Sequence, residues 1–242
     1  MGIFRGCLFT RFHFFDKHGR KRFAVPGGYT IVMCFSATAS FIAGGALSTA
    51  GAVLLSRVKN KKELPLAAIP LLFGVQQIIE GVVWLSLGSA LPNTLNLVGT
   101  YAYVMFSHVL WPVLLPVAVL LIETDPVRKK ILTIFSVVGL TLGLYLLYFV
   151  ATASMTSQIL NHSICYSSVR LPLPFAEVLY LVVVCGSCLV SSRKVICLLG
   201  GALFISYLAA HWFFSATLFS TWCFFAALLS VIVFIYFRKR KE

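Results

Sequence analysis

The stretch KKELPLAAIPLLFGVQQIIEGVVWLSL, residues 61–87, decides the fold class. Two lysines and a glutamate open it, and in the long apolar run that follows Glu80 is the only charged side chain. About 20 apolar residues are enough for a helix to cross the ~30 Å hydrocarbon layer of a bilayer. An acidic residue in such a helix costs about 2.5–3.5 kcal/mol, so it usually faces the bundle interior and has a partner. The stretch therefore predicts a membrane-spanning helix whose carboxyl group either functions or bridges helices.

The rest of the chain has the same character. It has 242 residues, of which 60% are hydrophobic and 11% charged, and its mean hydropathy is +0.94. This charge is too sparse to cover the surface of a soluble domain. We find seven apolar runs of spanning length, at 36–56, 65–89, 96–122, 131–151, 173–192, 195–214 and 217–237. We therefore predict an all-α, multi-pass protein of the plasma membrane, with seven transmembrane helices in a domain at 33–237.

Basic residues alternate between the connections of this bundle. Thirteen lie in the connections after the first, third and fifth runs and in the tail 238–242, whereas the opposite connections hold only Arg170. Such a bias marks the cytoplasmic side, so we expect the C-terminus in the cytoplasm and residue 34 outside. The net charge of +13 then favours contacts with the bilayer and its anionic lipid headgroups, and not nucleic acid. The sequence leaves a homo-oligomer open.

Residues 1–32 break this charge pattern. They place one acid, Asp16, and six basic residues on the side expected to be outside. The six are Arg5, Arg11, Lys17, Arg20, Lys21 and Arg22. Three interpretations stay open: translation starts at Met33, the segment is an Arg-rich targeting sequence, or it is an extracytoplasmic arm.

The cysteines give two expectations. Cys34 and Cys165 both fall on the outer side, so a disulfide between them is open, and a start at Met33 would leave Cys34 with a free amine and a nucleophilic thiol. Cys185 and Cys188 form a lone CxxC inside an apolar run. There, small packing residues are a better interpretation than a redox or metal motif.

Candidate site residues gather in the outer half of the bundle. Gln76, Glu80 and Trp84 stand four apart, so one helix face presents an amide, a carboxyl and an indole. On the next helix, His108 lies at a similar depth. Three further candidates belong to the fifth and sixth runs: Glu177, Tyr207 and His211.

Two kinds of chemistry fit these residues. Carboxylate, imidazole and thiolate groups suit zinc, copper or iron, and the candidate ligands are Glu80, His108, His211 and Cys34. The same groups suit a proton or a small polar ligand, with Glu80 as the candidate acid or base. The inner half of the bundle holds almost nothing ionisable, which disfavours a transport path.

Three functions therefore stay open, and the sequence does not decide whether the protein is an enzyme. The first is a binding or sensory protein, which the one-sided distribution of polar residues favours. The second is an intramembrane metal-dependent hydrolase, and the third is a small-solute transporter or proton-coupled channel.

Three local patterns complete the prediction. Ser36, Ser40, Gly44 and Ser48 recur at spacing four, which favours close packing of the first helix against a neighbour. Pro112 and Pro116 are expected to distort the third helix. Residues 152–172 are expected to form a short hairpin over the outer face.

The segments MCFSATASF (33–41), 61–87 and SHVLWPVLLP (107–116) resemble those of an uncharacterised family of small bacterial membrane proteins. That resemblance covers 33 to about 237 and implies a seven-helix fold that begins at Met33, but it implies no activity. Microbial rhodopsins fit poorly because the last run contains no lysine. Zinc hydrolases of the alkaline-ceramidase type fit poorly because that run lacks their paired histidines.

Overall fold

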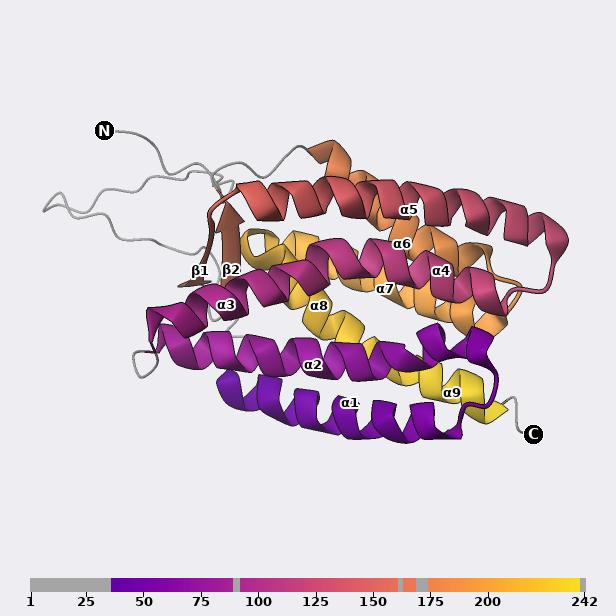
Figure 1. The fold of residues 1–242 in the computed structure, drawn as a ribbon, viewed down its shortest axis with the longest axis horizontal. Helices are drawn as coiled ribbons and strands as arrows, with labels where there is room; N and C mark the ends of the chain where they lie inside the picture. The colour runs from indigo at the N-terminus through magenta and orange to yellow at the C-terminus, as the bar shows by residue number, and fades with distance from the viewer. Residues whose placement is uncertain (1–35, 89–91, 161–162, 169–173, 240–242) are drawn as a thin grey trace, which may run out of the picture.

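The structure, a computed structural model, describes residues 36–88, 92–160, 163–168 and 174–239. Apart from one hairpin, these residues form helices that run along one another in a single bundle (Figure 1). Six segments are long and apolar enough to cross a membrane. They are α1 (Ala37–Arg57), η1 (Lys61–Glu63) with α2 (Leu64–Leu87), α3 (Asn93–Val104) with η2 (Met105–Leu110) and α4 (Trp111–Ile122), α5 (Pro126–Thr152), α7 (Lys194–Phe213), and η3 (Ser215–Thr217) with α8 (Leu218–Leu229) and α9 (Val231–Lys239).

A seventh apolar run, expected at 173–192, also forms a helix. It is α6 (Pro174–Val190), whose 17 residues make it shorter than the other six segments. Of the other runs, the fourth differs most, because α5 begins at Pro126 and not at 131. The Asp125 side chain accepts a hydrogen bond from the backbone N–H of Arg128 at 2.8 Å, and proline suits the first helical position. The basic residues 128–130 therefore lie inside a helix.

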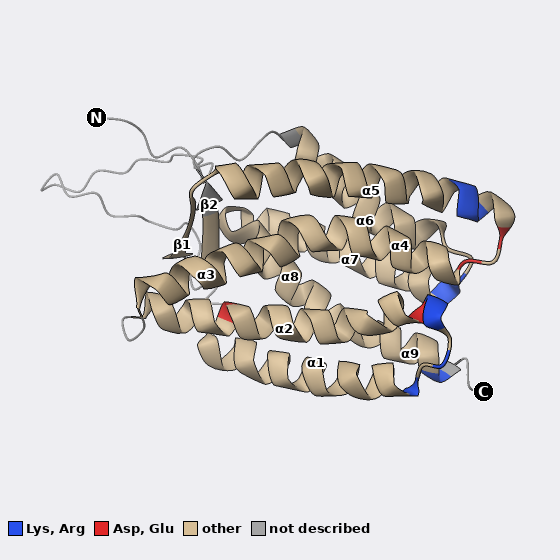
Figure 2. Ribbon diagram, viewed as in Figure 1, with Lys and Arg blue, Asp and Glu red and all other residues tan. Residues whose placement is uncertain are grey.

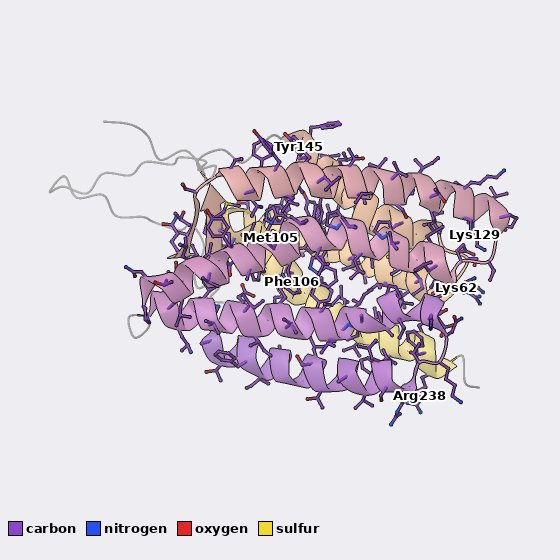
Figure 3. All side chains as sticks on the ribbon, in the orientation of Figure 1. Lys62, Met105, Phe106, Lys129, Tyr145 and Arg238 are labelled. Carbon is purple, nitrogen blue, oxygen red and sulfur yellow. The ribbon has the colours of Figure 1, made fainter. Side chains whose placement is uncertain are left out.

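The two ends of the bundle differ in chemistry. Lysine and arginine side chains gather at one end, the basic end, where Lys62, Lys129 and Arg238 lie (Figures 2 and 3). The opposite end, the hairpin end, carries the antiparallel strands β1 (Met155–Leu160) and β2 (Ser163–Ser168), so the predicted hairpin is confirmed. Cys165 of β2 is 1% exposed and disulfide-bonded. The partner cysteine lies outside the described residues, and so does Cys34, so the pairing of Cys165 with Cys34 stays a prediction.

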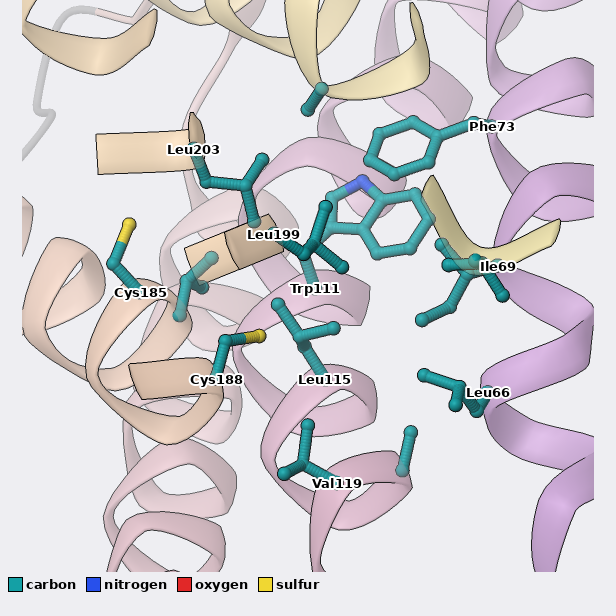
Figure 4. Close-up of a cluster of buried hydrophobic side chains, with 14 of the residues drawn as sticks. Leu66, Ile69, Phe73, Trp111, Leu115, Val119, Cys185, Cys188, Leu199 and Leu203 are labelled. Carbon is teal, nitrogen blue, oxygen red and sulfur yellow. The ribbon is translucent and has the colours of Figure 1, made fainter. Parts of the chain in front are cut away.

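The interior toward the basic end is apolar. Phe73 of α2 stacks on Trp111 of α4 with ring centroids 3.8 Å apart, and leucine, isoleucine and valine side chains surround this pair (Figure 4). Cys185 and Cys188 are free and buried here. A Cβ atom on Gly200 of α7 would lie 2.7 Å from Cys188 Cβ, so small residues let α6 and α7 approach closely. The packing interpretation of the CxxC is therefore supported.

Helix α1 packs on α2 through small residues. Ser40 and Gly44 of its spacing-four stripe are buried. A Cβ atom on Gly74 of α2 would lie 2.5 Å from the backbone nitrogen of Ser48, and one on Gly51 would lie 2.7 Å from Leu71 Cα. The backbones of α1 and α2 thus touch, which is how helices associate tightly in lipid.

Gly51→Ala should destabilise the protein, whereas Gly45→Ala should not. The added methyl group at residue 51 meets backbone atoms of α2, and such overpacking costs about 1–3 kcal/mol. A Cβ atom on Gly45 meets nothing within 4 Å, so alanine there should be neutral or slightly stabilising. Thermal unfolding of both variants in the same detergent checks this, and equal midpoints would contradict the proposed contact.

Candidate functional site

Glu80 lies inside the bundle and is 2% exposed. Its Oε1 accepts a hydrogen bond from Ser220 Oγ of α8 at 2.5 Å, and its Oε2 accepts one from Gln77 Nε2 at 3.3 Å. A buried carboxyl group needs such donors because it has no water to bind. Ser220 comes from a helix 140 residues further along the chain, so this bond joins the two ends of the fold.

Gln76 lies beside this carboxyl group and faces α4 and α8. Its Oε1 accepts a hydrogen bond from the indole Nε1 of Trp111 at 2.8 Å. The indole N–H only donates, so the amide orientation is fixed and Gln76 Nε2 points elsewhere. The Cys223 thiol of α8 faces Gln76, Tyr103 and Glu80.

Two tyrosines close the site toward the hairpin end. Tyr103 of α3 stacks on Tyr166 of β2, with ring centroids 4.3 Å apart and an interplanar angle of 8°. Both hydroxyl groups are buried, and each tyrosine has an electrostatic interaction with Glu80. Burial raises the pKa of Tyr166 well above its ordinary value, so its hydroxyl group stays protonated and can donate.

His108 lies in η2, a π-helical turn that ends where Pro112 follows. Pro112 has no N–H to donate to the preceding turn, and the hydroxyl group of Tyr180 donates to the carbonyl oxygen of Ser107 at 2.6 Å. A π turn thus precedes Pro112, whereas the kink expected in the inner half of the helix stays a prediction. Such turns occur frequently at functional sites.

Hydrogen bonds assign the tautomer of His108. Ser107 Oγ donates to the carbonyl oxygen of Val104 at 3.3 Å, so it accepts from His108 Nδ1 at 2.7 Å. Nε2 therefore carries the lone pair. The imidazole ring packs on Phe219 of α8, the residue before Ser220, with centroids 4.3 Å apart. Neighbouring residues of α8 thus contact both His108 and Glu80.

Several polar atoms of this site lack a hydrogen-bond partner within the described part of the chain. They are Gln77 Oε1, His108 Nε2 and Tyr166 Oη, whereas the polar groups of Gln76 and Tyr103 have the Cys223 thiol beside them. Most buried polar groups in proteins are paired, because an unpaired one costs about 1–3 kcal/mol. Unpaired buried polar atoms are therefore concentrated around one buried carboxyl group.

The remaining candidates form a second group or stand alone. Tyr207 Oη donates to Glu177 Oε1 at 2.6 Å, and His211 Nδ1 lies 3.9 Å from the same oxygen, with the His211 side chain 58% exposed. Among the described residues, no hydrogen bond or ion pair joins this group to Glu80 or His108. Trp84 stands alone: it is half-buried, and its side chain makes no hydrogen bond to another described residue.

The metal candidates can be compared directly with the structure. Over residues 36–88, 92–160, 163–168 and 174–239, no group of three or more His, Cys, Asp and Glu side chains is placed to hold a metal ion. Cys34, the fourth candidate ligand, lies outside these residues.

A second buried carboxyl group, Glu123 at the basic end, has a complete set of donors. Its two oxygens accept from the Ser192 hydroxyl group (2.6 Å) and N–H (2.7 Å), the Ser191 hydroxyl group (3.3 Å), and the N–H groups of Thr124 (2.7 Å) and Asp125 (3.0 Å). Burial alone would raise the pKa of Glu123, but these hydrogen bonds lower it from 4.5 to about 2. Glu123 thereby ties the α4–α5 connection to the α6–α7 connection.

Sequence reasoning missed most partners of Glu80. Ser220, Cys223 and Tyr166 come from distant segments, and each residue type is common in membrane proteins. One signal was present, because Asn96, Thr100 and Tyr103 repeat at spacings four and three on α3. That spacing predicts a polar face on an otherwise apolar helix.

Fold and site together define a class: helical bundles with membrane-spanning dimensions and a buried carboxyl group among unpaired polar atoms. The chain belongs to the family described as a family of unknown function (DUF6629), whose sequence model matches residues 33–242. An uncharacterised family was the resemblance that the sequence suggested. No curated protein and no solved structure matches the chain.

The hydrogen bonds of Glu123 should make the free energy of unfolding depend on pH in the acid range. A carboxyl group whose pKa is lower in the folded state contributes stability above its unfolded pKa and loses it as the pH falls toward the folded pKa, here between about pH 5 and about pH 2. Glu123→Gln should lower the free energy of unfolding by about 1–3 kcal/mol at neutral pH and flatten this acid-dependent loss. Unfolding measured across that range checks both effects, and identical pH profiles would contradict them.

Proposed function

We propose that this protein is an integral membrane protein that binds a small polar ligand inside its helix bundle, at the site around Glu80. In this proposal it acts as a binding or sensory protein. The single observation that carries the proposal is the set of unpaired buried polar atoms around Glu80. Glu123 provides the comparison, because a carboxyl group that only ties loops together has all its donors within the chain.

The geometry limits the ligand. The Tyr166 hydroxyl group offers a donor, whereas Gln77 Oε1 and His108 Nε2 offer acceptors, so the ligand should both accept and donate hydrogen bonds. A cavity of about 30 Å³ adjoins Trp111 and Cys223, but it is lined mainly by apolar side chains and does not include Gln77, Glu80 or His108, so it does not set the size of the ligand. A metal ion such as zinc, copper or iron is the alternative occupant, with less support because the described residues hold no group of three or more metal-ligating side chains.

Transport and hydrolysis receive less support. A transporter needs polar groups through both halves of the bundle, whereas the half toward the basic end is packed with apolar side chains. A metal-dependent hydrolase needs about three protein ligands around its metal, and the described residues offer no such group.

We also propose seven spans, with α6 as the fifth. On α5 and α7, exposed aromatic side chains near the hairpin end lie 18 residues from basic residues at the other end. The pairs are Lys130 with Tyr148 and Lys194 with Trp212, and for α6 the exposed Phe175 pairs with Arg193, three residues beyond the end of the helix. At 1.5 Å per residue the separation on α5 and α7 is about 27 Å, close to the thickness of the hydrocarbon layer. Aromatic and basic belts at that spacing support α6 as a full crossing.

Two observations support an orientation with the basic end in the cytoplasm. Lysine and arginine concentrate on the cytoplasmic side of membrane proteins. Disulfides form in oxidising compartments, and Cys165 at the hairpin end is disulfide-bonded, whereas the half-buried Cys197 near the basic end is free.

Cysteine labelling in whole cells tests this orientation. Gln158→Cys on β1 should react with a membrane-impermeant maleimide in intact cells, because residue 158 is exposed at the hairpin end. Lys129→Cys, exposed at the basic end, should react only after the membrane is permeabilised. The signal of the parent protein is subtracted, and the reverse pattern would contradict the proposed orientation.

The bound ligand can be sought in protein purified without added ligand. We expect native mass spectrometry and elemental analysis for zinc, copper and iron to find a bound species in the wild-type protein. Glu80→Gln should lower its occupancy by roughly tenfold, because it removes a charged hydrogen-bond acceptor. Glu177→Gln, the same change in the second group, should leave occupancy unchanged.

An empty wild-type protein, or equal occupancy in Glu80→Gln, would contradict ligand binding at this site. A metal ion as the bound species would select the alternative occupant.

A further inference from the structure

Polar residues continue from the Glu80 site to the hairpin end of the bundle. On α3, Asn96, Thr100 and Tyr103 lie on one face, and Ser107 follows in η2. Asn96 is half-buried, Thr100 is 1% exposed, and Tyr103 and Ser107 are fully buried. We call Asn96, Thr100 and Tyr103 the α3 polar face. This face points inward, as polar residues of a membrane helix usually do.

The outer part of this face is hydrogen-bonded to the hairpin. Ser157 Oγ of β1 accepts from Thr100 Oγ1 at 2.9 Å and from Asn96 Nδ2 at 3.0 Å. Asn96 Nδ2 also lies 3.0 Å from Ser86 Oγ of α2. These four side chains make a connected polar entrance beneath the hairpin, in which Thr100 is buried and the other three are half-buried.

The inner part of the face leads to Glu80. Tyr103 lies one turn from Thr100, and its hydroxyl group meets the Cys223 thiol, whereas that of Tyr166 is unpaired. Cys223 faces Tyr103 on one side and Glu80 on the other. Hydroxyl, amide and thiol groups therefore succeed one another from the surface to the carboxyl group.

In the part of the chain that the structure describes, polar side chains do not continue from Glu80 toward the basic end. There Phe73, Leu115, Leu203 and Ala226 line the space around Trp111 (Figure 4). The one serine on this lining, Ser230, donates its hydrogen to the carbonyl oxygen of Ala227 in its own helix.

We infer that Glu80 exchanges its proton with the hairpin side of the membrane only, along the α3 polar face. A hydronium ion at the entrance gives up a proton, water and hydroxyl groups pass it on by accepting one and donating another, and the Glu80 carboxylate becomes a neutral carboxylic acid. The titratable groups that face Glu80 are Tyr103 of α3, Tyr166 of β2 and Cys223 of α8. The inference deepens the proposed function, because it makes the state of the same site follow the pH of one compartment.

Infrared spectroscopy of the full chain, oriented in sealed vesicles, tests this inference. The carbonyl band of a protonated buried carboxyl group is assigned to Glu80 by its absence in Glu80→Gln. Acid and alkaline buffers are then applied to one side at a time. The band should follow the pH on the hairpin side and ignore the pH on the basic side. A band that follows the basic side, both sides or neither would overturn the inference.

Variants of Thr100 test the route itself. Thr100→Val keeps the shape but removes the hydroxyl group, so it should slow proton equilibration of Glu80 by roughly tenfold. Thr100→Ser should restore the rate, which separates loss of the route from loss of packing. The matched control is Thr141→Val on α5, where the hydroxyl group is exposed and bonded to its own helix. Equal rates in Thr100→Val and Thr141→Val would overturn the route.

The two proposals fail separately. A ligand that is lost in Glu80→Gln while the band ignores both compartments would leave the binding site standing and remove the proton route.

Discussion

The hydrogen bond from Ser220 to Glu80 joins a helix near the end of the chain to one near its start. A carboxyl group within a lipid-embedded bundle has no water to bind, so it must find its donors on neighbouring helices. This requirement places α8 against α2, and α8 then brings Phe219 to His108 and Cys223 to Gln76. The hairpin completes the arrangement by stacking Tyr166 on Tyr103. Four distant segments of sequence thus meet around one carboxyl group.

Two buried carboxyl groups in the same chain differ in how completely their surroundings satisfy them. Glu123 receives donors from two connections, and these bonds hold the basic end together. Glu80 receives only two, and polar atoms without partners surround it. Burial by itself would not distinguish them, since each is 2% exposed. The difference lies in how completely the neighbouring groups are satisfied, which is the physical basis for assigning the site to Glu80.

Much of the fold follows from the sequence, because the cost of exposing polar groups to lipid produces long apolar runs. All seven runs coincide with helices, and six of these have spanning dimensions. Gln76, Glu80 and His108 were expected inside the bundle, because polar residues in apolar runs are conspicuous, and all three are buried there. Their partners could not be identified, since the sequence does not say which face of α8 meets α2. For the same reason Glu177, Tyr207 and His211 were placed with Glu80, whereas they form a group of their own. The account of residues 1–32 lies outside the described residues and stays a prediction.

The π-helical turn at Met105–Leu110 also constrains the length of the chain. A π turn holds more residues than an α turn, and each residue of an α-helix adds a rotation of about 100°. A chain with one residue fewer here would close the turn into an α-helix and rotate α3 relative to α4. Thr100 and Tyr103 would then leave the interior without any substitution. The inward position of these residues therefore depends on the number of residues in the turn as well as on their types.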